Sequence, residues 1–214
     1  MRTSNIEKAE LIIRLKRKFG VDEPIFADEI ITAWGEYSRP RVFQLLKTFC
    51  EDGSIAKYAI GVYYFPEKTV FGTNSVLSAV SVAEKRYLKS KGRVFGYYSG
   101  LTLLNMVGLT NQVPNTREIV TSNESTRVRE VVIGKRRFLI RRAKESITSE
   151  NAPLFQLLEV FDKLDRPLEK YQAENLLALA GERIDKQMLA QCAKYYPKRA
   201  LQNLINSEIG YVVA

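Results

Sequence analysis

The side chains of this chain that could do chemistry are mainly basic and suit binding better than catalysis. Five of them follow one another over a short stretch, namely Ser38, Arg39, Arg41, Gln44 and Lys47. An arginine fork matches the acceptors on the edge of guanine, a glutamine amide matches adenine, and Ser and Lys bond to phosphate oxygens. Lys57 and Tyr58 follow in the next segment. This set of residue types favours contact with a nucleic acid.

The residues needed for the common catalytic sites are missing or scattered. The chain contains no histidine, which excludes Ser-His-Asp and Cys-His catalysis and most zinc sites. The two cysteines, Cys50 and Cys192, lack the spacing of a metal or redox motif. The acidic pairs 22–23 and 28–29 adjoin expected helix starts, where a carboxylate favours the helix dipole. We therefore expect no catalytic residue, metal or cofactor, and no enzyme activity.

The positive charge is concentrated in the middle of the chain. Residues 1–67 carry no net charge, residues 68–145 carry +10 and residues 146–214 carry −1. Much of the excess belongs to one expected hairpin, whose basic residues are Arg127, Arg129, Lys135, Arg136, Arg137, Arg141 and Arg142. Glu130 is the single acid among them. We expect a basic surface for a nucleic acid or an acidic partner, the alternative being a solvated sheet edge.

Three helices and a hairpin are expected in residues 1–67. Ser4 and Glu7 have the spacing of a capping box at the first helix, and the stretch 25–34 predicts a second. The third begins at Ser38, where Pro40 fits the first turn, and Val42, Leu45, Leu46 and Phe49 form its apolar face. Strands at 54–58 and 62–65 complete a winged helix-turn-helix. Its use could be DNA binding, or packing and dimerisation alone.

The rest of the chain predicts an α+β domain at 68–145 and a helical region at 146–214 packed on it. A helix is expected at 75–88, strands at 93–97 and 117–121, and a hairpin of 127–133 with 136–142 about the turn Gly134-Lys135. The apolar end, 208–214, is expected to dock as a strand or tail. No stretch of about 18 apolar residues is present, so we expect no membrane span and a cytoplasmic protein.

Several of these segments resemble the AbiEi-type antitoxins of bacterial type IV toxin–antitoxin systems. They are GVYYFP (61–66), YYSGLTLLNMVGLTNQVP (97–114), KRRFLIRRA (135–143) and NAPLFQLLEVF (151–161). The second is the most specific of them. The resemblance extends over residues 4–161 and leaves the helical tail after about residue 165 without a family pattern.

The resemblance implies two activities. An N-terminal winged helix would bind the protein's own promoter as double-stranded DNA and repress it, with contacts on 38–47 and 57–63. The remainder, 68–214, would counteract a nucleotidyltransferase-like toxin, directly or through a shared target. The alternative is a stand-alone transcriptional regulator whose basic second domain binds a nucleic acid or a ligand.

Overall fold

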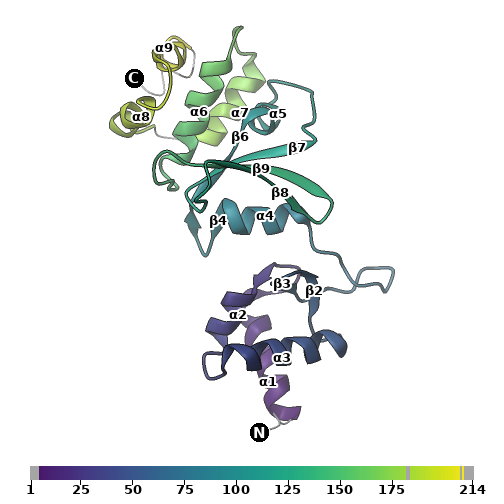
Figure 1. Cartoon of the computed structure of the whole chain (residues 1–214). Helices are drawn as coiled ribbons and strands as arrows, with labels where there is room; N and C mark the ends of the chain where they lie inside the picture. The colour runs from purple at the N-terminus through teal and green to yellow at the C-terminus, as the bar shows by residue number, and fades with distance from the viewer. Residues whose placement is uncertain (1–4, 182–183, 208, 210–214) are drawn as a thin grey trace. The chain divides into compact units, whose positions relative to one another are not determined.

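The computed structural model describes residues 5–181, 184–207 and 209 of the 214-residue chain. The fold is mixed α+β, with N-terminal helices, then sheets, then C-terminal helices, as predicted (Figure 1). Contacts divide the chain into two compact units, residues 1–82 and 83–214. Within the described residues, no helix is long and apolar enough to cross a membrane.

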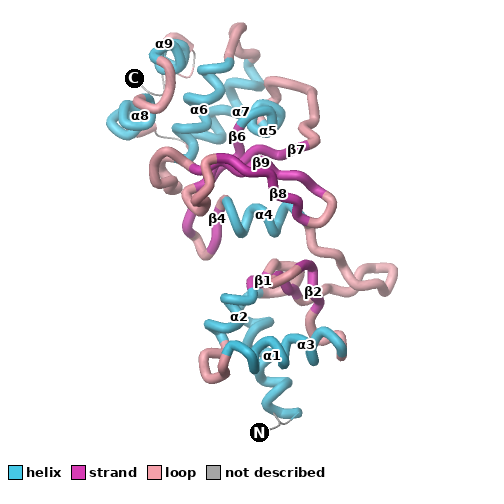
Figure 2. Tube along the Cα trace, viewed as in Figure 1, coloured by secondary structure: helices cyan, strands magenta, loops and turns pink. Residues whose placement is uncertain are grey.

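The first unit contains three helices and a three-stranded sheet. The chain runs through α1 (Asn5–Phe19), β1 (Ile25–Phe26), α2 (Ala27–Ala33), α3 (Arg39–Glu51), β2 (Ala56–Ala59) and β3 (Val62–Tyr64). The sheet order is β1-β3-β2 and both pairings are antiparallel. Figure 2 shows strands β1 and β2 in magenta and the helices of this unit in cyan. Trp34 is fully buried in the core, where its ring centre lies 5.9 Å from that of Phe49.

Helix α3 forms where the sequence predicts it. Val42, Leu45, Leu46 and Phe49 are all buried, as their spacing requires. Ser38 has the extended backbone of an N-cap, and its carbonyl accepts a 3.0 Å bond from Val42 N, although its hydroxyl makes no cap bond. Burial of this apolar row fixes the rotation of the helix, so the polar row that includes Gln44 and Lys47 faces solvent.

The second unit is built on a four-stranded sheet of order β6-β7-β9-β8. Its strands are β6 (Gly96–Ser99), β7 (Thr116–Thr121), β8 (Val128–Ile133) and β9 (Arg136–Arg142). The β8–β9 hairpin has the predicted turn at Gly134-Lys135, and β9 pairs with β7 in parallel. A small hairpin of β4 (Lys89–Ser90) and β5 (Arg93–Val94) precedes the sheet.

Helices cover both faces of this sheet. The end of α4 (Ala79–Tyr87) packs on one face, where Tyr98 Oη donates to Glu84. The other face carries α5 (Gly100–Met106) and α6 (Ala152–Lys163), with the Tyr97 and Phe155 rings stacked 6.0 Å apart. Helices α7 (Lys170–Ala180), α8 (Lys186–Ala193) and α9 (Lys198–Ile205) complete the unit (Figure 1).

The unit boundary differs from the expected domain bounds at residues 67 and 145. The segment after residue 67 is bonded to the first unit, because Ser75 hydrogen-bonds to Asp22 and its carbonyl accepts from Tyr64. Residues 83–145 and 146–214 share one hydrophobic core, in which Tyr97 and Leu103 pack with Phe155 and Leu158. The helical region is therefore part of the same unit as the sheet.

Several element predictions need correction. The helix expected at 75–88 begins at Ala79, so Val76 precedes the helix and is exposed. In α1, Leu11 and Leu15 are buried whereas Ile6 and Ile13 are exposed. The strand expected at 93–97 is interrupted at Phe95, whose N–H bonds to the Leu88 carbonyl. The expected cap at Ser4 and all of the tail except Ile209 lie outside the described residues.

Candidate nucleic-acid interface

The exposed face of α3 brings together the polar residues expected to contact DNA. Arg41 Nη1 donates a 3.1 Å hydrogen bond to Gln44 Oε1, so these two side chains form one polar pair. Arg39 lies 3.4 Å from Asp28 and its guanidinium is 5.8 Å from the centre of the Phe43 ring. Exposed ion pairs contribute little to stability, so Arg39 can exchange Asp28 for another anion at low cost.

A hollow of about 420 Å³ separates α3 from the β2–β3 hairpin. Lys47 lines it from the helix and Lys57 from β2, while Leu46, Cys50 and Tyr63 form its floor. Glu51 adds one acid and lies 3.9 Å from Lys47. Two lysines on opposite walls of an exposed hollow form a site where the backbone of a polyanion can lie.

The hairpin that borders the hollow is short. Its turn projects Ile60, which is 93% exposed. Tyr58 is half-buried, and burial raises the pKa of its hydroxyl, so the phenol stays protonated at neutral pH and can donate a hydrogen bond. Of the expected DNA contacts, Ser38, Arg39, Gln44, Lys47 and Lys57 are exposed, and Arg41 is half-exposed. Neither Phe43 nor Ile60 was expected at this surface, although i+4 spacing from Arg39 places Phe43 there.

The basic residues of the β8–β9 hairpin do not form one continuous surface. Arg129 is bonded at 2.6 Å to Glu124 and at 3.2 Å to the Tyr87 hydroxyl, on the α4 face of the sheet. Arg141 pairs with Glu118 at 3.1 Å, and its strand position places it on the opposite face. The alternation of strand side chains explains this division.

Three arginines of the hairpin pair with carboxylates, and two of the three carboxylates belong to residues outside the hairpin. Glu118 is on β7 and Glu124 follows it, whereas Glu130 pairs with Arg137 at 3.7 Å. Arg142 donates to the Ser125 carbonyl. For Arg127, Lys135 and Arg136, the described residues provide no ion pair within 4.0 Å. The expected patch of seven is thus divided: Arg129, Arg137 and Arg141 hold carboxylates, whereas Lys135 and Arg136 at the hairpin turn hold none from the described part of the chain.

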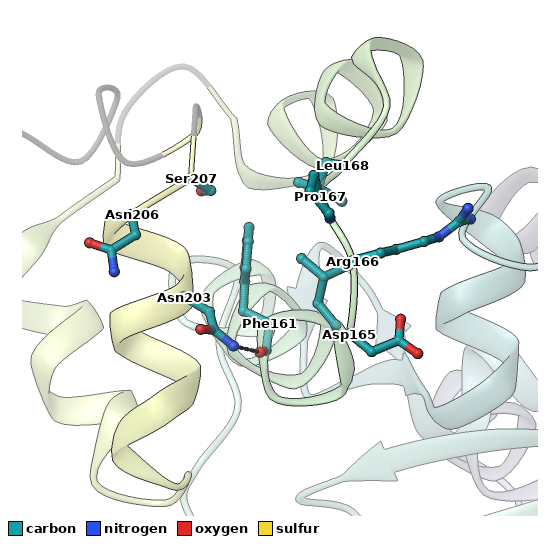
Figure 3. A pocket seen from close by; sticks show the side chains of 9 residues that line it. Phe161, Asp165, Arg166, Pro167, Leu168, Asn203, Asn206 and Ser207 are labelled. Carbon is teal, nitrogen blue, oxygen red and sulfur yellow. Dashed lines mark hydrogen bonds between the residues drawn. The ribbon is translucent and has the colours of Figure 1, made fainter.

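A second hollow, of about 450 Å³, lies between the end of α6 and α9 (Figure 3). Asn203 donates to the Phe161 carbonyl at 3.0 Å, Ser207 donates to the Leu204 carbonyl, and Arg166 lies 3.8 Å from Glu169. These lining groups are engaged in structural contacts. The described residues contain no cluster of His, Cys, Asp or Glu that could hold a metal ion.

No protein-family model matches this chain, and no curated protein is significantly similar to it.

Proposed function

We propose that the first unit is a winged helix that binds double-stranded DNA, with α3 in the major groove and the β2–β3 hairpin as the wing. The element order α1-β1-α2-α3-β2-β3 and the sheet order β1-β3-β2 support this proposal, since winged helices have both. A recognition helix enters the groove with its N-terminal residues first, and Arg39 and Arg41 are at that end of α3.

The observation that carries the proposal is the hollow between α3 and the hairpin. A phosphate strand that passes between helix and wing would meet Lys47 on one side and Lys57 on the other. Arg41 and Gln44 would then lie over base edges, where a bidentate contact to guanine or adenine contributes about 1–3 kcal/mol of discrimination. Residues 1–67 carry no net charge, so the attraction for DNA would come from local cations such as Lys47 and Lys57.

We infer further that the protein is an antitoxin that represses its own promoter, similar to the AbiEi type. The resemblance in 61–66, 97–114, 135–143 and 151–161 supports this. The second unit would then counteract a nucleotidyltransferase-like toxin, with the cations at the β8–β9 turn bound either to the toxin's nucleic-acid target or to phosphates beside the winged helix. A cytoplasmic location and the absence of enzyme activity belong to this proposal.

A reporter gene behind the DNA upstream of the coding sequence tests repression. Wild-type protein should repress the reporter, Arg39→Ala/Arg41→Ala should lose repression, and the control Lys16→Ala/Arg17→Ala, on the exposed side of α1, should retain it. Equal repression by wild type and the α3 variant would exclude α3 as the DNA-reading helix.

Co-expression with the neighbouring gene tests the antitoxin function. If the neighbour encodes a toxin, the wild type and the α3 double variant should both restore growth, because protection is assigned to the second unit. Repression by the wild-type protein, together with a neighbouring gene whose product is not toxic, would favour the stand-alone regulator instead.

A further inference from the structure

Phe43 differs from the other apolar residues of α3. Val42, Leu45, Leu46 and Phe49 are at most 2% exposed, whereas Phe43 is 38% exposed and lies on the polar side of the helix. Burial in the core accounts for the four others. It does not account for an aromatic ring placed among residues that face solvent.

The surroundings of Phe43 are those of a nucleic-acid contact. Arg39 precedes it by one helical turn with the guanidinium 5.8 Å from the ring centre, and Lys47 follows by one turn. The ring also lines the hollow whose opposite wall carries Lys57. Phe43 is therefore an apolar contact point surrounded by groups that bind phosphates and base edges.

We propose that Phe43 contacts the C5-methyl group of a thymine and so determines which DNA sequence the protein prefers. Thymine presents a methyl group in the major groove, and phenylalanine is one of the side chains that contact it. The inference rests on the proposed function, because it requires α3 to lie in that groove. Removing one buried methyl group weakens binding about fourfold.

Uracil substitution tests this directly, since uracil is thymine without the methyl group. A duplex is first selected from a random library with the full-length protein, and each thymine is then replaced by uracil in turn. Wild-type protein should bind about fourfold more weakly when the thymine that Phe43 contacts is replaced, and this sensitive position should be a single thymine or one of two adjacent thymines. Phe43→Ala should bind the thymine and uracil duplexes equally at that position, and Phe43→Leu should keep part of the difference.

The matched controls are Lys47→Ala and Ile60→Ala. Each should retain the thymine-to-uracil ratio, even where total affinity falls, and circular dichroism should show all variants folded. A wild type that is indifferent to uracil at every position, or a Phe43→Ala variant that keeps the ratio, overturns the assignment of Phe43 and leaves DNA binding intact. If the selection from the random library enriches no duplex, both the proposed DNA binding and the assignment of Phe43 are overturned.

Discussion

The carboxylate of Glu159 accepts a 2.7 Å hydrogen bond from the backbone N–H of Gly100 and so joins α6 to the start of α5. The same carboxylate accepts from the Ser99 hydroxyl at 2.9 Å and from Lys163 Nζ at 2.9 Å. The side chain is buried, so each of these bonds replaces hydration that the group has lost. These bonds attach the segment YYSG (97–100), at the start of α5, to α6 through Glu159.

Replacement of Glu159 by Ala should destabilise the second unit by about 3 kcal/mol, because Ser99 and the Gly100 N–H are left buried without a partner. The single tryptophan, Trp34, belongs to the first unit and provides a separate probe. In urea, circular dichroism of Glu159→Ala should show that the second unit unfolds at a lower urea concentration than in wild type. The urea midpoint followed by Trp34 fluorescence, which reports on the first unit, should stay constant. The exposed control Glu174→Ala should change neither. A shift of both signals together would show that the two units do not unfold independently.

Gly96 should tolerate no side chain. A Cβ there would lie 2.0 Å from the Tyr87 carbonyl oxygen and 2.7 Å from that of Val120, both of them backbone atoms that cannot move aside. Gly96→Ala should cost at least about 3 kcal/mol. At Gly92, which has φ of 76° and open space around it, alanine should cost only about 1 kcal/mol from backbone strain. Thermal unfolding followed by circular dichroism ranks the two variants, and similar melting temperatures would contradict the packing at Gly96.

Glu124 should make part of the stability depend on pH. Burial opposes ionisation of this carboxyl, but the Thr126 N–H and the Arg129 guanidinium outweigh burial and lower its pKa below 4.5. Because the folded-state pKa is below the unfolded value, the stabilisation is present above about pH 4.5 and disappears as pH falls through the lowered pKa. Urea unfolding at neutral and at acidic pH measures how much the free energy of unfolding falls on acidification. The fall should be smaller for Glu124→Gln than for wild type. An unchanged loss would mean that the carboxylate is not held by Arg129.

The cations at the β8–β9 turn should contribute to nucleic-acid binding by the full-length protein. Each neutralised phosphate adds about −0.9 to the slope of log K against log salt. Lys135→Glu/Arg136→Glu should therefore flatten the slope on a selected duplex. The control Lys194→Glu/Lys198→Glu carries the same charge change on exposed positions of the C-terminal helices and should leave the slope unchanged. Equal slopes for wild type and the turn variant would identify the hairpin as a solvated sheet edge.

Local patterns were sufficient to predict α3 and the β8–β9 hairpin. The apolar row of α3 and the turn Gly134-Lys135 each lie within one short segment, so periodicity and turn chemistry are enough. The parallel pairing of β7 with β9 joins residues about twenty positions apart, such as Glu118 and Leu139, and no local signal specifies it. For the same reason the ion pair of Arg141 with Glu118, 23 positions away, could not be foreseen.

The outward-facing polar residues of α3 were predictable because a helix has a fixed period. Once Val42 and Phe49 are placed inward, Gln44 and Lys47 must face outward. Phe43 was missed because an aromatic residue next to a buried valine resembles a core residue, although its i+4 spacing from Arg39 places it on the polar side of the helix, where it is 38% exposed. The pairing of Lys47 with Lys57 across a hollow depends on how the hairpin folds back on α3, which is a tertiary property.

The most direct test of the central claim is a gel shift with purified full-length protein and the DNA upstream of its own gene, in the presence of excess non-specific duplex. We predict a discrete complex for wild type and for Lys16→Ala/Arg17→Ala, and roughly 5-fold to 150-fold weakening for Arg41→Ala, which corresponds to the loss of one base contact. A wild type that binds the upstream DNA no better than the competitor, or an Arg39→Ala/Arg41→Ala variant that binds as well as wild type, would contradict the account.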